Sequence, residues 1–411
     1  MFMKVSWRRL RVDAAALAAV SVAVAVAAGA NASVSSAAVS AQAASSCIPA
    51  APSALPQMPS SLAAGLTADT HAALAGYPTP VYNSPWAKYV PKKKTGWKAA
   101  FLINVPGAYP QGVLSGLQAA AKASGGKIVS VVSETTADPS SVTEQIQQMQ
   151  SLLEQHVNVI FALLASPTGL NAVIDKAAKE GIPVFSIAGQ STDKNAINVM
   201  ANTTQLGYLG AAGLVKAIGP SKSVLDVQGI PGVTLNSQIV NAADKVFSAC
   251  KESIVGSLTG YFVSPLAKTA VLQFLASHPG TVNGVFQASG MAPGVISAFQ
   301  QVGRAVPPIA DVNPVSASLA YWNQNKSSYH GVAVGESPKE TGEYAIALAE
   351  ALQAGRGIKI TDTPFAPPLI TDSNLSQWVE PGWTSASTVE ANGPVNAIPI
   401  TALVNGYTTK Q

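Results

Sequence analysis

Amides, hydroxyls, aromatic rings and one carboxylate stand at points where short apolar runs of the sequence end. Amides and hydroxyls hydrogen-bond the hydroxyl groups of a small molecule, while flat rings cover its C–H faces. The set therefore predicts a site for a small polar solute such as a sugar or a polyol. Its members are Asn104, Tyr109, Gln111, Gln190, Thr203, Asn236, Tyr261, Phe262, Ser289, Asn313 and Glu336.

The sequence lacks the motifs that commonly build a catalytic or cofactor centre. It contains no G-x-S-x-G nucleophile elbow, no Walker A loop and no H-E-x-x-H zinc motif. The four histidines, at positions 71, 156, 278 and 330, are scattered, and we interpret each as a surface or helix-end residue. We therefore expect a binding protein rather than an enzyme, with no cofactor and no metal ion.

Short apolar segments alternate with amphipathic segments of helical length from Trp97 onward. Continuous apolar strands separated by helices predict α/β lobes with doubly wound parallel sheets, covered on both faces. Ligands of such sheets bind beyond the carboxyl ends of the strands, where the candidate site residues stand. The predicted strands are 99–104, 127–132, 157–164, 183–187, 223–227, 254–258, 282–286, 309–312 and 331–334.

Length and composition favour a two-lobed globular chain. Its 411 residues exceed what one hydrophobic core usually supports. Hydrophobic residues make up 48% and charged residues 11%, which argues against disorder. The formal net charge is +4, and the basic run 92–94 sits in a Pro-flanked segment that we interpret as solvated. We expect no nucleic-acid partner.

The N-terminus has the layout of a secretory signal. A basic segment, 4–11, precedes the stretch 14–30, which is almost wholly Ala and Val. We predict a signal peptide over 1–43 that ends at Ala-Gln-Ala, 41–43, with Ala-Asn-Ala, 30–32, as the other candidate cleavage site. A retained membrane anchor is the alternative, because the apolar stretch has about the 17–20 residues that span a bilayer.

The two cysteines, Cys47 and Cys250, allow three interpretations. Export places them where disulfides form, which favours a bridge between them over two free thiols. A lipid anchor at Cys47 is the third interpretation, although Ala44-Ser45-Ser46 before it lacks the apolar residue of a lipobox. The choice depends on Cα separations, which a sequence does not give.

Five short segments together carry a family resemblance. They are 101–104 with Tyr109, Lys-Glu-Gly-Ile-Pro-Val at 179–184, Val-Gln-Gly-Ile-Pro-Gly at 227–232, Ala-Ser-His-Pro at 276–279, and Glu-Ser-Pro at 336–338 leading to Thr341-Gly342. Through them the chain from about Trp97 to Trp383 resembles the type I periplasmic substrate-binding proteins, the group around the sugar-binding proteins of ABC importers.

The resemblance implies two lobes that are joined by three chain crossings and close on the ligand by a hinge. We expect a Pro/Ala/Ser-rich linker or wrapped extension at 44–96 and a C-terminal extension at 386–411. Lobe 1 is predicted at 97–202 plus 337–369, and lobe 2 at 203–336 plus 370–385.

The resemblance also implies roles for particular residues. Tyr109 matches the aromatic residue that stacks on a sugar ring in lobe 1, and Phe262, or its neighbour Tyr261, matches the aromatic residue of lobe 2. Several charged positions of the family are neutral here: Ala188-Gly189 replaces an Asp-Arg pair, Ser237 an arginine, Ser289-Gly290 an Asn-Asp pair, and Val312 with Asn313 an aspartate. Glu336 conversely replaces a glutamine. These departures favour a ligand with fewer hydroxyls, or one that brings a cationic or donor group to Glu336.

Plainer structural roles compete with these assignments. The aromatic residues can pack the lobe cores, and Asn104 or Asn236 can cap turns. The carboxylate of Glu336 can interact with the dipole of a helix that begins just after it.

On balance we expect an exported, monomeric solute receptor, in the periplasm or on the outer face of the cytoplasmic membrane, that delivers a small molecule to an ABC permease. The alternative is a receptor of the same fold that signals to a membrane partner.

Overall fold

The computed structural model describes residues 46–91, 96–104, 108–133, 141–394 and 396–410. The predicted signal peptide at 1–43 and the basic run 92–94 lie outside these residues. Within them, none of the helices combines the length and the apolar character needed to cross a membrane.

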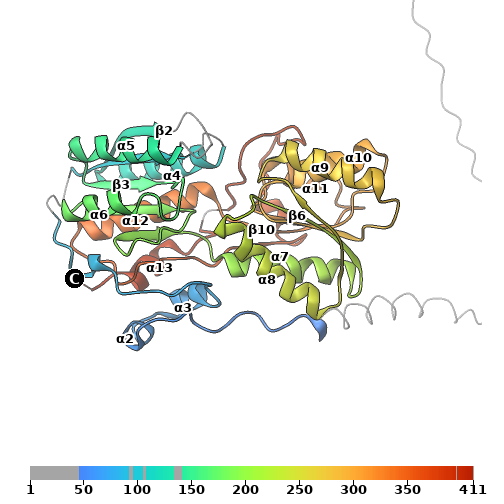
Figure 1. Ribbon diagram of the computed structural model, residues 1–411, viewed down its shortest axis with the longest axis horizontal. Coiled ribbons are helices and arrows are strands. Elements are labelled where there is room, and N and C mark those ends of the chain that lie inside the picture. Colours follow the sequence, from blue (N-terminus) through green and yellow to red (C-terminus); the bar gives the residue numbers. More distant parts are fainter. Residues whose placement is uncertain (1–45, 92–95, 105–107, 134–140, 395, 411) are drawn as a thin grey trace, which may run out of the picture.

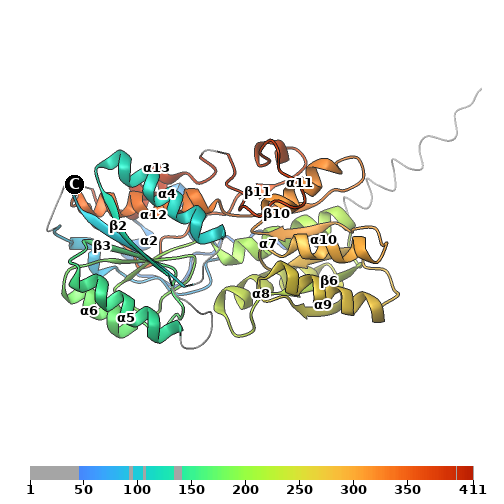
Figure 2. The same ribbon diagram turned by 90° about the horizontal axis from the view of Figure 1, so that it is seen from above.

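Lobe 1 is built on a five-stranded sheet in the order β2-β1-β3-β4-β5, with every neighbouring pair parallel. Its inner strands β3 and β4 are buried at every position, because helices cover both faces. Figure 2 shows α4 and α12 on one side of the sheet and α5 and α6 on the other. The strands are β1 (Lys98–Ile103), β2 (Lys127–Ser133), β3 (Val159–Ala162), β4 (Val184–Ile187) and β5 (Ala196–Val199); the helices are α4 (Ala108–Ser124), α5 (Ser141–Glu154), α6 (Asn171–Lys179) and α12 (Pro338–Gln353).

Lobe 2 carries a six-stranded sheet in the order β11-β10-β9-β8-β6-β7. Its strands are parallel except β11, which runs antiparallel to β10 at the edge. The strands are β6 (Ser223–Gln228), β7 (Ser253–Thr259), β8 (Gly284–Gln287), β9 (Ile309–Val312), β10 (Val332–Val334) and β11 (Leu369–Ile370); the helices are α7 (Thr203–Ile218), α8 (Thr234–Ala249), α9 (Ser264–Ser277), α10 (Ala292–Gln301) and α11 (Ser316–Gln324).

The predicted fold class is confirmed: the molecule has two α/β lobes with mostly parallel sheets. All nine predicted strands are present, with ends that agree within two residues. The prediction missed β5 and β11. β5 is four residues long and includes the polar Asn198, and β11 has only two residues, so neither stands out as an apolar run.

Three connections cross between the lobes, from β5 to α7, from β10 to α12 and from α12 to β11. The chain also crosses at both ends. Residues 46–91, the N-terminal extension, run beneath both lobes from the end of α8 to α3 (Ala68–Leu74) (Figure 1). Leu74, Tyr77 and Trp86 of this extension are buried. The C-terminal helix α13 (Ile400–Tyr407) returns to lobe 1 and packs on α3 and α12. The shorter elements are α2 (Ser60–Ala63), η1 (Pro85–Lys88) and η2 (Leu375–Gln377).

A disulfide joins Cys47 to Cys250, with a Cα separation of 4.9 Å, and ties the start of the N-terminal extension to the end of α8. The predicted bridge is therefore confirmed. A lipid thioether at Cys47 needs the same sulfur atom, so the bridge and the lipid anchor exclude each other.

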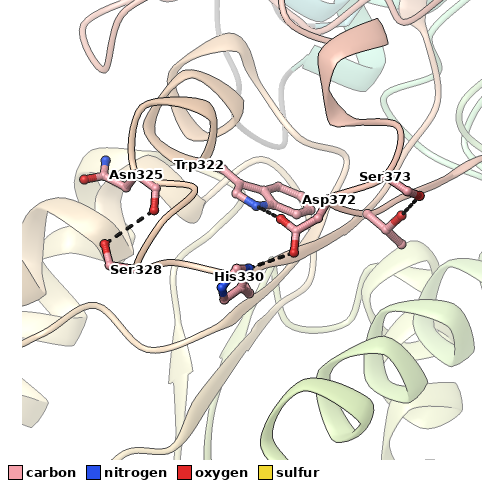
Figure 3. Close-up of polar contacts among 7 residues, drawn as sticks. Trp322, Asn325, Ser328, His330, Asp372 and Ser373 are labelled. Atoms are coloured by element: carbon pink, nitrogen blue, oxygen red, sulfur yellow. Dashed lines mark hydrogen bonds and ion pairs between the residues drawn. The ribbon is translucent and has the colours of Figure 1, made fainter. Parts of the chain in front are cut away.

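A polar cluster fixes the segment that follows β11 to the rest of lobe 2 (Figure 3). Asp372 accepts a hydrogen bond from Trp322 Nε1 at 2.8 Å, and its second oxygen lies 2.8 Å from Nδ1 of His330. His330 is exposed, as predicted, and Trp322 is buried in the lobe core. This cluster sets the path of the chain toward its C-terminal segment.

Candidate functional site

Two adjoining cavities lie between the lobes and together form the cleft. Their volumes are about 280 Å³ and about 810 Å³. They share six lining residues, of which Tyr109 and Ala188 come from lobe 1 and Leu235 and Phe262 from lobe 2. Both volumes suit small-molecule sites. The carboxyl ends of the strands of both sheets thus face one space.

A hydrogen-bonded tyrosine–carboxylate pair lines the smaller cavity. The hydroxyl of Tyr109, in the first turn of α4, donates a hydrogen bond to Oε1 of Glu336. Glu336 follows β10 at a crossing between the lobes and is only 7% exposed. Burial raises the pKa of Glu336, while the bonds from Tyr109 and from the backbone N–H of Ala201 lower it. Burial and the charge of Glu336 raise the pKa of Tyr109 well above its usual value, so Tyr109 keeps its proton and donates.

A second carboxylate, Glu390, lines both cavities. Its backbone forms an isolated antiparallel β-bridge with Val315, just before α11. The hydroxyl of Ser316 donates a hydrogen bond to the carbonyl of the neighbouring Val389 at 2.6 Å. Burial, and after it the charges of Glu336 and Asp311, raise the pKa of Glu390 to about 7.

The sequence-based search missed Glu390 because it scanned only the turns after strands, and Glu390 belongs to the predicted C-terminal extension. One signal was available: Glu390 is the single charged residue between Glu380 and Lys410.

Lobe 2 contributes an amide, a hydroxyl and a ring from its strand-end turns. Asn313 Nδ2 donates to Ser289 Oγ at 3.1 Å, and Asn313 Oδ1 is buried without a hydrogen-bond partner among the described residues. The ring of Phe262 lies directly over Gly229: a Cβ atom at that glycine would come within 2.0 Å of the ring. Gly229 therefore leaves room for the ring that lines the cleft.

Gln190 and Asn104 line the larger cavity on the lobe 1 side. Gln190 Nε2 donates to Thr79 Oγ1 at 2.7 Å and to Asp362 Oδ1 at 2.9 Å. Thr79 belongs to the N-terminal extension and Asp362 to the crossing between α12 and β11. The side chain of Asn104 donates to the carbonyl of Leu164 at 3.4 Å.

The remaining four predicted site residues line neither cavity. Gln111 and Tyr261 are exposed; Tyr261 is 48% exposed, while its neighbour Phe262 lines both cavities. Buried Thr203 and Asn236 bond within lobe 2: Thr203 donates to Gln238 Oε1 at 2.7 Å, and Asn236 accepts from the Gly229 N–H at 2.7 Å. The turn-holding alternative thus describes Asn236.

The electrostatic character of the cleft is acidic. Neither cavity has a lysine, an arginine or a histidine among its described lining residues. Apolar side chains such as Met200, Leu206 and Leu235 complete the smaller cavity. No group of three or more His, Cys, Asp or Glu residues in the described part of the chain is placed to hold a metal ion.

A two-lobed α/β molecule with a polar and aromatic cleft between its lobes has the architecture of a solute-binding protein. The family model described as "Periplasmic binding protein domain" matches residues 100–357. The chain belongs to this family of binding and transport proteins, so the resemblance predicted from the five segments is confirmed.

Several known proteins are similar to the chain. A xylitol-binding protein of Mycolicibacterium smegmatis is 24% identical over 243 residues, which cover 58% of this chain and 68% of that protein. A solute-binding protein of an ABC transporter from Thermobispora bispora superposes with a TM-score of 0.63 at 23% identity, over 75% of this chain and 94% of the other. Another, from Mycobacterium smegmatis with bound glycerol, gives a TM-score of 0.62 at 20% identity, over 72% and 99% of the two chains.

Proposed function

We propose that this protein is an extracytoplasmic solute receptor that captures a sugar, a polyol or a related solute in the interlobe cleft and delivers it to an ABC permease. The observation that carries the proposal is the convergence of polar and aromatic side chains from both lobes on one cleft, in a chain of the periplasmic binding protein family. The solutes of its relatives, xylitol and glycerol, are polyols of the predicted kind.

The ligand contacts follow from the cleft. The rings of Tyr109 and Phe262 cover the apolar faces of the solute, one from each lobe. Hydrogen bonds come from the side chains that line the two cavities: Asn104, Gln190, Ser289, Asn313, Glu336 and Glu390. Since both lobes contribute, binding favours a closed arrangement of lobe 1 (97–202 with 337–369) against lobe 2 (203–336 with 370–385).

Export and partners complete the proposal. The N-terminal segment directs the chain out of the cytoplasm. The Cys47–Cys250 bridge then forms in the oxidising compartment outside. Because that bridge uses the Cys47 sulfur, membrane association does not go through a lipid at this residue. The receptor acts as a monomer, catalyses no reaction and meets the permease with its solute bound.

A calorimetric titration of the purified mature protein tests this function. Xylitol, glycerol and a panel of aldoses are the probes, and a thermal-shift screen of the same set gives a second readout. A solute that binds only the folded state raises the melting temperature by mass action. We expect saturable 1:1 binding of at least one probe, lost in a Tyr109→Ala, Phe262→Ala double variant that still folds. Binding that survives this double variant places the site elsewhere and contradicts the proposal.

A further inference from the structure

Hydrogen-bond acceptors outnumber donors in the smaller cavity. Glu336 and Glu390 present carboxylate oxygens, and the Asn313 Oδ1 atom is buried without a partner in the described part of the chain. Part of the donor capacity nearby is already used, since the Tyr109 hydroxyl donates to Glu336 and one N–H of Asn313 Nδ2 donates to Ser289. The second N–H of Asn313 and the Ser289 hydroxyl are fewer than the acceptor oxygens of the two carboxylates and Asn313. A ligand that fits this cavity must bring donors of its own.

The charges in the cavity favour a ligand whose donors are positively charged. Glu336 and Glu390 lie close enough for the charge of Glu336 to raise the pKa of Glu390. No described lining residue carries a positive charge. No hydrogen bond or ion pair within the described residues engages the Glu390 carboxylate. Closing the lobes over two carboxylates that have no cationic partner is unfavourable unless the ligand supplies one.

We infer that the cleft selects a solute that carries a cationic amine, such as an amino sugar or an amino-substituted polyol, and that Glu336 and Glu390 bind its ammonium group. This inference rests on the proposed solute-receptor function and specifies its ligand class. An ammonium group has three N–H donors, and three acceptor groups line the cavity: the carboxylates of Glu336 and Glu390 and the amide oxygen of Asn313. The hydroxyl groups of the solute then reach Gln190 and Asn104 in the larger cavity.

A neutral hydroxyl serves the same cavity less well. It donates one hydrogen bond and leaves the charge of both carboxylates uncompensated. An ammonium group donates three bonds, each assisted by charge, and removes one unit of negative charge from a site that closure isolates from water. The inference is therefore tested by the difference in binding affinity between two solutes that carry an amine and a hydroxyl at the same position.

The experiment compares matched solutes on the full mature protein by calorimetric titration at pH 7.5. D-Glucosamine is paired with D-glucose and with N-acetyl-D-glucosamine, which keeps the nitrogen but not the charge, and 1-amino-1-deoxysorbitol is paired with sorbitol. We expect the amine of at least one pair to bind about 10- to 100-fold more tightly than its neutral partners, the range of a charge-assisted contact.

Variants then assign the preference to the carboxylates. Glu390→Gln and Glu336→Gln keep the side-chain shape and should each reduce the amine-to-neutral ratio at least tenfold. Glu380→Gln is the matched control, because it makes the same charge change at an exposed residue that lines neither cavity. Circular dichroism melting of each variant verifies folding. If a cleft variant fails to fold, the wild-type ratio decides alone.

The outcomes separate the inference from the function on which it rests. Neutral solutes that bind as tightly as their amines overturn the amine preference and leave the solute-receptor function standing. An amine preference that persists in both cleft variants also overturns the inference, because the carboxylates then do not cause it. Binding of no sugar, polyol or amine contradicts the proposed function and the inference together.

Discussion

Removal of the Cys47–Cys250 disulfide should lower the free energy of unfolding by about 5 kcal/mol. The bridge closes a loop between residues that are 203 positions apart. In the chain-entropy account, a loop of that length reduces the entropy of the unfolded chain by an amount worth about 5 kcal/mol at 25 °C. The melting temperature should fall by roughly 5–10 °C, given the unfolding entropy of a chain of this size.

The native state should survive this change because other contacts hold the N-terminal extension. Tyr208 donates to the Pro49 carbonyl at 2.8 Å, and Asn202 Nδ2 donates to the carbonyls of Ala73 and Ala75 at 2.9 and 3.0 Å. Alanine is the better replacement, since Cys250 is buried and a serine there would bring an extra polar group into the core.

Guanidinium titration of the wild type and of the Cys47→Ala, Cys250→Ala double variant, each with and without reductant, measures the difference. Reductant should destabilise the wild type to the level of the variant and leave the variant unchanged. A difference below about 1 kcal/mol would refute the loop-entropy reasoning, because it would mean that the unfolded chain is not constrained by the bridge.

Three further predictions concern the cleft. Small-angle scattering should show a smaller radius of gyration when a confirmed ligand saturates the protein, and an unchanged profile at saturation would count against hinge closure. Gly229→Ala should displace the Phe262 ring and weaken ligand binding about tenfold or more, with loss of an aromatic contact as the cause; unchanged affinity would mean that this ring does not contact the solute. Burial and the charges of Glu336 and Asp311 raise the folded-state pKa of Glu390 to about 7, above its unfolded value. Between about pH 4.5 and 7, the Glu390 carboxyl group of the ligand-free protein therefore holds a proton in the folded state that it has lost in the unfolded state. The Glu390 contribution to the free energy of unfolding should therefore grow less favourable as the pH rises through that window, and Glu390→Gln should flatten the measured stability–pH curve there; parallel curves would show that Glu390 is solvated.

The sequence predicted nine strands of the two sheets because each of these nine is a short apolar run that local patterning reveals. It also predicted five of the residues that the structure brings to the smaller cavity: Tyr109, Phe262, Ser289, Asn313 and Glu336. The reason is geometric. Residues that follow parallel strands converge at the carboxyl edge of a sheet, so position along the chain is enough to place them in a cleft.

Position along the chain does not predict the residues that reach the cleft through long-range packing. Glu390 reaches the cleft because the chain after β11 passes beside α11, and no local pattern encodes that path. Tyr261 and Phe262 are neighbours in one turn, and both have positive φ angles, near 60°. Phe262 lines both cavities and Tyr261 does not, a difference that two adjacent aromatic residues in a sequence do not specify. The side chain of Asn236 accepts a hydrogen bond from the Gly229 N–H instead of lining the cleft. Asparagine side chains often bond to nearby backbone groups in this way.

The N-terminal extension, predicted as a linker or a wrapped extension, takes part in the framework of the cleft. Asp362, on the crossing between α12 and β11, accepts hydrogen bonds from Tyr77 of the extension at 3.1 Å and from Gln190 at 2.9 Å. Burial raises the pKa of Asp362, and these bonds, with others from Thr361 and Asn198, oppose the shift. Gln190 shares its amide with Thr79 of the same extension. The segment that the disulfide ties to lobe 2 is thus bonded, through one buried carboxyl group, to a residue that lines the cleft from lobe 1. A disturbance of the extension therefore reaches the candidate site through a short chain of hydrogen bonds, and not only through global stability.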